Sequence, residues 1–90
     1  MKTIIKFEAP WCATCKQIEQ GLYDLAVLHG VGVIRVNVEE EAATAKEYGI
    51  RQLPTLVLVD GNEEEIDRTY NLLGLRQMLD IQKTIDKGQT

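Results

Sequence analysis

Apolar runs and amphipathic stretches alternate along this chain. Two runs rich in Ile and Val, residues 3–7 and 31–38, predict buried strands. Between them, apolar residues recur at three- and four-residue spacing and predict one helix of roughly 17 residues with a buried face. That face is formed by Cys15, Ile18, Leu22, Leu25 and Ala26. Pro10 ends the first strand and Gly30 closes the helix, so a βαβ unit with parallel strands is expected.

The second half of the chain predicts a short helix, a hairpin and a final helix. Residues 41–48 are rich in Ala and are followed by Gly49, which suits a helix C-terminus. Residues 56–59 form an apolar strand, and the turn signal at residues 60–62, Asp-Gly-Asn, joins it to a polar strand over 64–70. Residues 72 to about 87 carry a broad apolar helical face, and residues 88–90 are expected to fray.

The order of elements is therefore βαβ, a short helix, then ββα. This order predicts an α/β fold with a four-stranded mixed sheet, strand order 2-1-3-4, flanked by helices on both faces. The 90 residues, 1–90, make a single domain without a repeat or linker. In open α/β sheets the working site lies beyond the carboxyl end of a central strand, which here is the segment after Phe7.

Composition and charge exclude several classes of function. The net charge is −4, and the acidic runs at 39–41 and 63–65 are typical of solvated faces, so a nucleic-acid partner is not expected. No apolar run is long enough to cross a membrane. The first residues imitate the charged lead of an export signal, but Lys6 and Glu8 interrupt the apolar stretch, which favours a strand. A cytoplasmic protein is expected, and there a disulfide is more often transient and catalytic than structural.

The chain's two cysteines, Cys12 and Cys15, lie at the predicted start of the first helix. A helix N-terminus stabilises negative charge, so Cys12 is expected to be a partly exposed nucleophile with a lowered pKa. Cys15, one turn deeper, would attack Cys12 and resolve a mixed disulfide with a substrate. The competing interpretations are a structural disulfide and a zinc or iron–sulfur site shared by two chains. His29, the other soft ligand, lies a helix length away, where it suits the helix end.

Two distant stretches resemble the thioredoxin family. Residues 7–16 read FEAPWCATCK and are similar to the family's Phe-x-Ala-x-Trp-Cys-x-x-Cys-Lys signature. Residues 48–56 read YGIRQLPTL and are similar to its Tyr-Gly-Ile-Arg-x-Ile-Pro-Thr-Leu, and Asn37 also falls where thioredoxins often carry Asn. The likeness covers nearly the whole chain, which resembles the trimmed core that thioredoxins share with glutaredoxins. The glycines that glutaredoxins use for glutathione are missing, so glutathione binding is not expected.

The resemblance implies a thioredoxin fold and the reduction of protein disulfides through Cys12 and Cys15. Pro54 is implied to be the family's cis-proline facing the two cysteines, with the Leu53 backbone pairing with the substrate chain; an ordinary loop proline is the alternative. The residues implied to bind substrate are Trp11, Ala13, Thr14, Leu53, Pro54, Tyr70 and Asn71. Tyr70 and Asn71 replace the glycine expected after the fourth strand and would complete an apolar rim.

The resemblance also implies partners but no cofactor or metal beyond the redox-active disulfide. Those partners are disulfide-bearing protein substrates, among them a ribonucleotide reductase, and an electron donor similar to thioredoxin reductase. The protein itself is expected to be a monomer. The alternatives are a glutaredoxin-like electron donor for ribonucleotide reductase and a redox-inert binding module that uses the same groove.

Lys6 stands where thioredoxins bury an aspartate, and Glu8 follows on the same face of the strand. We expect Lys6, Glu8 and Arg35 to form a cluster that replaces the family's Asp–Lys pair and lowers the thiolate pKa. Glu39 is another candidate partner for Lys6, and a Lys6 side chain that reaches solvent is the alternative. The cation, together with Thr14 in place of the family's proline, predicts a weaker reductant than Gly-Pro thioredoxins.

Overall fold

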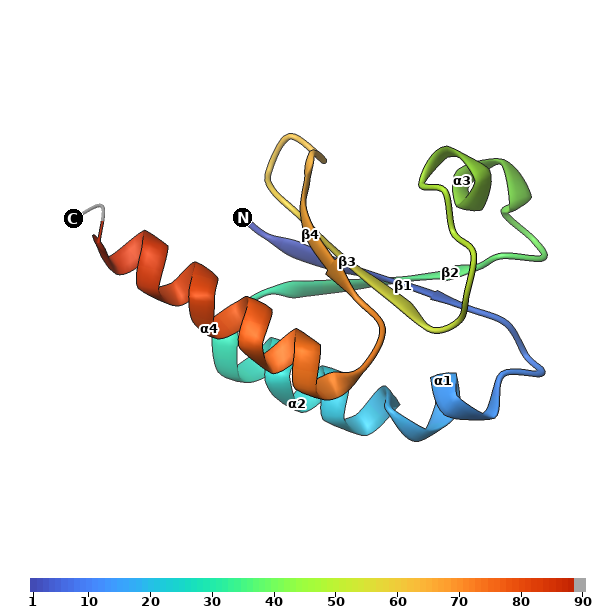
Figure 1. Cartoon of the computed structure of the whole chain (residues 1–90), viewed down its shortest axis with the longest axis horizontal. Helices are drawn as coiled ribbons and strands as arrows, with labels where there is room; N and C mark the ends of the chain where they lie inside the picture. Colours follow the sequence, from blue (N-terminus) through green and yellow to red (C-terminus); the bar gives the residue numbers. More distant parts are fainter. Residues whose placement is uncertain (89–90) are drawn as a thin grey trace.

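Strand β1 (Thr3–Glu8) lies inside a four-stranded sheet in the computed structural model, which describes residues 1–88 (Figure 1). It pairs in parallel with β2 (Gly32–Asn37) and in antiparallel orientation with β3 (Thr55–Val59). Strand β4 (Glu65–Thr69) then pairs with β3 in antiparallel orientation. The order β2-β1-β3-β4 confirms the predicted arrangement of the mixed sheet.

Helices cover both faces of the sheet, which explains why its central strands β1 and β3 are almost entirely buried (Figure 1). Helices α2 (Glu19–His29) and α4 (Leu72–Gly88) lie on one face, and α3 (Ala42–Glu47) lies on the other. The core beneath α2 and α4 contains Ile4, Ile18, Leu22, Ala26, Leu56, Leu58, Leu75, Met78 and Leu79. The core on the α3 side contains Ile5, Phe7, Val36, Val57 and Val59.

The long helix predicted after Pro10 is divided in two. Helix α1 (Ala13–Gln17) ends at Ile18, where φ is −86° and ψ is −8°, and α2 begins at the next residue. The prediction of one unbroken helix was therefore wrong, because no proline or glycine marks the junction and the apolar periodicity continues across it. The predicted buried stripe is nevertheless present: Cys15, Ile18, Leu22 and Ala26 are buried and Leu25 is half-buried.

The other predicted elements begin and end within one residue of the observed ones. Gly30 and Gly49 follow α2 and α3 with φ of 65°, the left-handed conformation that lets a helix end without a side-chain clash. The Asp60 side chain accepts hydrogen bonds from the backbone N–H groups of Asn62 and Glu64 and closes the hairpin. Gly88 is the last residue of α4 rather than part of a frayed end, and residues 89–90 lie outside the described part of the chain.

Across residues 1–88, none of the helices combines the length and apolar character that a membrane span requires.

Candidate active site

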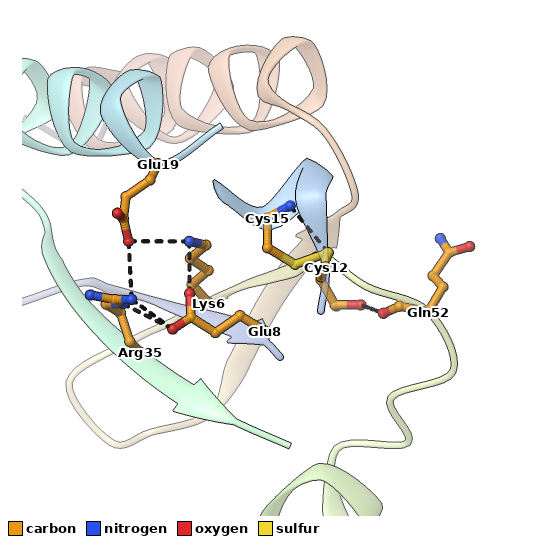
Figure 2. Close-up of a disulfide and its surroundings, with 8 residues drawn as sticks. Lys6, Glu8, Cys12, Cys15, Glu19, Arg35 and Gln52 are labelled. Carbon is orange, nitrogen blue, oxygen red and sulfur yellow. Dashed lines mark hydrogen bonds and ion pairs between the residues drawn. A yellow bond between two sulfur atoms is a disulfide. The ribbon is translucent and has the colours of Figure 1, made fainter. Parts of the chain in front are cut away.

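Cys12 and Cys15 form a disulfide at the beginning of α1, with their Cα atoms 5.3 Å apart. Cys12 is the N-cap residue of α1: its backbone is extended, and its Sγ accepts a hydrogen bond of 3.1 Å from the backbone N–H of Cys15 (Figure 2). The N-terminal N–H groups of a helix lack partners within the helix. The same N–H group would stabilise a Cys12 thiolate once the disulfide is reduced.

Both cysteines are buried in the oxidised protein. Cys12 is 6% exposed and Cys15 is 1% exposed. The expectation of a partly exposed Cys12 is therefore wrong for this state, because its sulfur is bonded to Cys15 and folded back onto the first turn of α1. The order of depth agrees with the prediction, since Cys15 is the deeper of the two. The neighbouring Ala13 and Thr14 are exposed, so the segment between the cysteines is open to a partner.

The segment before β3 reaches the same edge of the sheet as the two cysteines. The peptide bond between Leu53 and Pro54 is cis, and Pro54 is buried. Thr55 pairs with Phe7 in the antiparallel register, so the chain enters β3 where it leaves β1. The buried Thr55 hydroxyl donates a 2.6 Å hydrogen bond to the Gln52 carbonyl and closes this loop. Sheet topology thus brings together two motifs that are some forty residues apart in the chain.

Trp11 lies beside the disulfide and is 68% exposed. Its indole N–H donates to a Glu39 carboxylate oxygen at 3.2 Å. The suggestion that Glu39 pairs with Lys6 is therefore wrong: the Asn37 side chain accepts the Glu39 backbone N–H and turns the chain toward the indole. A groove of about 230 Å³ adjoins the indole and is lined by Trp11, Val38, Ala45, Ile50, Arg51, Gln52 and Leu53.

Tyr70 and Asn71 follow the last strand. Tyr70 is one residue beyond the pair that Leu56 forms with Thr69, which places it next to the start of β3. The Asn71 side-chain oxygen accepts the backbone N–H of Gly74 at 2.7 Å and caps α4. The Asn71 side chain thus has a structural role that the sequence analysis missed, although Asn before an apolar helical pattern is a known capping signal. A role for both residues in the substrate rim stays a prediction.

Lys6 projects from the middle of β1 into a closed set of ion pairs (Figure 2). Its Nζ lies 2.7 Å from one Glu8 carboxylate oxygen and 3.4 Å from a Glu19 carboxylate oxygen. Arg35 Nη2 lies 2.9 Å from the other Glu8 oxygen and 3.2 Å from the same Glu19 oxygen. These four side chains, Lys6, Glu8, Arg35 and Glu19, are called the charge ring below.

The charge ring brings together the three residues that the sequence analysis grouped. Lys6 and Arg35 are paired across β1 and β2, and Glu8 lies on the same face. Lys6 is only 1% exposed, so the alternative in which it reaches solvent is wrong. Glu19 was not predicted from the sequence, although its spacing from Leu22 gave a signal: a residue three positions earlier shares the buried helix face.

The charge ring changes the acidity of Glu8. Burial alone would raise the pKa of the Glu8 carboxyl, but the hydrogen bonds and charges of Lys6 and Arg35 outweigh burial and hold this pKa below its usual range.

Acid is therefore expected to destabilise the folded protein through Glu8. An unfolded Glu has a pKa of about 4.3. The folded pKa lies lower, so Glu8 contributes stability above the unfolded value, and this contribution is lost as the pH falls through the folded value. Glu8→Gln should flatten the acid side of the stability curve, measured by denaturant unfolding at several pH values. The control is Glu40→Gln, an exposed acid, and equal slopes for both variants would contradict the prediction.

The remaining candidate ligands give no metal centre. Within residues 1–88, no three His, Cys, Asp or Glu side chains are grouped so as to hold a metal ion. His29 Nε2 lies 3.5 Å from an Asp80 carboxylate oxygen, so His29 links the end of α2 to α4.

Comparisons with known proteins point to a single family. The sequence model of the Thioredoxin family matches residues 1–87. Thioredoxin 1 of Synechococcus elongatus is 29% identical over 86 residues, which cover 93% of this chain and 77% of that protein. The thioredoxin of Haemophilus influenzae is 36% identical over 62 residues, which cover 67% of this chain and 58% of that protein.

Solved structures agree with the sequence comparisons. Mitochondrial thioredoxin 3 of Saccharomyces cerevisiae, in its oxidised form, superposes with a TM-score of 0.80 at 28% identity. That alignment covers 88% of this chain and 76% of the yeast chain. Fasciola hepatica thioredoxin gives a TM-score of 0.79 at 27% identity, covering 88% of this chain and 78% of that one.

Proposed function

Because the chain belongs to the thioredoxin family of dithiol–disulfide oxidoreductases, we propose that Cys12 is its nucleophile and Cys15 its resolving cysteine. The observation that carries this assignment is the Cys12–Cys15 disulfide at the start of α1. Cys12 is the outer sulfur and accepts a backbone N–H, which favours its thiolate as the attacking group. Cys15 is deeper and within bonding reach of Cys12 alone, which suits the second step.

The reaction is a two-electron exchange in two steps. In the first, the Cys12 thiolate attacks one sulfur of a substrate disulfide, and the other substrate sulfur leaves as a thiolate that takes a proton from water. In the second, Cys15 loses its proton and attacks Cys12, so the mixed disulfide breaks and the Cys12–Cys15 disulfide forms. The second substrate sulfur leaves as a thiolate and is protonated. The substrate disulfide is reduced and the dithiol of this protein is oxidised.

Substrate docking is assigned to the surface around the disulfide. The exposed Trp11 and the adjoining groove would receive apolar substrate side chains. The exposed residues Ala13 and Thr14 would contact the substrate next to the attacked disulfide. The Leu53 backbone before Pro54 would pair with the substrate chain as an added strand.

The natural partners follow from this chemistry. Substrates are folded proteins with an accessible disulfide, and a ribonucleotide reductase is one candidate. The oxidised form needs a separate donor similar to thioredoxin reductase, and the disulfide serves in place of a bound cofactor. Such a cycle belongs in a reducing compartment, which supports a cytoplasmic location.

The test is catalysed reduction of a disulfide-bonded protein such as insulin, with dithiothreitol as the electron source. Wild-type protein is expected to accelerate reduction, and the Cys12→Ser/Cys15→Ser double variant is expected to leave the uncatalysed rate unchanged. Equal rates for the two proteins would favour a redox-inert docking module instead. The reduction potential of the pair, measured against a reference dithiol, then shows whether it is the weaker reductant that Thr14 and Lys6 predict.

A further inference from the structure

We propose that the buried Lys6 ammonium stabilises the Cys15 thiolate during the resolving step, which makes Lys6 a positioning residue for a negative charge rather than a structural ion-pair partner alone. This inference rests on the proposed function of Cys15. Resolution requires a thiolate at a site that is 1% exposed. Burial in apolar surroundings disfavours a thiolate, so a compensating positive charge is needed nearby.

Lys6 and Cys15 line the same cavity. It has a volume of about 280 Å³, and its wall is formed by Lys6, Glu8, Ala9, Pro10, Cys15, Lys16, Glu19, Arg35 and Asn37. A space of this size with several polar groups in its wall accommodates water. Water in the cavity would connect Cys15 with the charge ring and would accept the thiol proton during resolution.

The charged groups around the cavity come from four elements. Strand β1 supplies Lys6 and Glu8, and β2 supplies Arg35. Helix α1 supplies Lys16, and α2 supplies Glu19. Three cations therefore face two carboxylates. The excess positive charge would stabilise a negatively charged thiolate in the cavity wall.

The charge ring is also asymmetric in depth. The Lys6 side chain is 1% exposed, whereas the side chains of Glu8, Glu19 and Arg35 are 15%, 36% and 50% exposed. Water screens the outer members most strongly, and the field of the buried ammonium acts through the low-dielectric interior. Although the ring is neutral as a whole, its buried end is therefore positive.

The test isolates Cys15 by working in a Cys12→Ser background, where it is the single thiol. Its pKa is measured in the reduced protein from the ultraviolet absorbance of the thiolate. Adding Lys6→Met is expected to raise the pKa of Cys15 by about one unit, which means about tenfold less thiolate at neutral pH. Adding Glu8→Gln removes the nearest counter-charge of Lys6 and is expected to lower the pKa of Cys15. If Lys6 acts through its charge, the two variants shift the pKa of Cys15 in opposite directions. Loosened packing would shift this pKa in the same direction in both variants.

The matched control is Lys2→Met, which removes an equal charge from an exposed ion pair with Asp86 and should leave the pKa of Cys15 unchanged. If Lys6→Met alone does not fold, the Lys6→Met/Glu8→Gln variant removes both charges together and is also expected to raise this pKa. An unchanged pKa in the folded variants, or shifts of the same sign for Lys6→Met and Glu8→Gln, would overturn the proposal. Because the Cys12→Ser background does not turn over, this result is independent of whether wild-type protein reduces insulin.

Discussion

Replacing Cys15 with serine is expected to stop turnover halfway and leave the protein covalently joined to its substrate through Cys12. A serine hydroxyl does not attack a disulfide at neutral pH, so the mixed disulfide formed in the first step persists. Serine has nearly the size of cysteine, so the fold should remain. The measurement is the mass of the product under non-reducing conditions. We expect one substrate adduct per protein, which a reductant releases. The rate of substrate reduction should fall to the uncatalysed rate.

Cys12→Ser is the matched control and should form no adduct, because Cys15 is deeper in the fold. If Cys12→Ser trapped substrate and Cys15→Ser did not, the assigned roles would be reversed. Continued turnover by Cys15→Ser would mean that resolution comes from an external thiol. The two cysteines would then no longer work as a pair.

Phe7→Ala is expected to cost about 3–5 kcal/mol of unfolding free energy, the usual range for removing a fully buried aromatic ring. Phe7 has no exposed surface, and its ring centroid lies 5.3 Å from that of Tyr48 in a tilted arrangement. A domain of this size has a total stability of about 5–15 kcal/mol, so the loss is a large fraction of it. Denaturant unfolding monitored by circular dichroism measures the change.

The effect of Phe7→Ala should extend to the active site. Leu53, which precedes Pro54, packs against the core cluster that contains Phe7. A cavity in that cluster removes support from the loop beside the disulfide. Phe7→Leu serves as the control, because it keeps most of the apolar volume and should lose much less stability. A loss below about 1 kcal/mol for Phe7→Ala would contradict the close packing at this position.

The elements of the fold were predictable because each one follows from a local pattern. Apolar runs marked β1, β2 and β3, and glycine marked the ends of α2 and α3. The site was predictable in part for the same reason, since the two cysteines and Pro54 belong to short motifs. The junction at Ile18 was not predictable, because both sides of it share one periodicity.

The charged contacts were harder to predict because they join separate elements. Lys6, Glu8 and Arg35 could be grouped, since strand alternation and the pairing of β1 with β2 place them on one face. Glu19 belongs to a helix, and its contact with Lys6 depends on how that helix crosses the sheet. Glu39 was misplaced because the turn after β2 points its carboxylate toward Trp11.

The division between α1 and α2 at Ile18 does not detach the redox pair from the rest of the protein. Helix α1 is five residues long, and Cys15 is its buried residue, whereas α2 is held in the core by Leu22 and Ala26. Ile18 itself is buried in the same core cluster, and helical hydrogen bonds run through it: its N–H donates to the Thr14 carbonyl, and the Leu22 N–H donates to the Ile18 carbonyl. The redox pair is thus anchored through one residue to the packed helix, so its position relative to the sheet is fixed by core packing rather than by a loop.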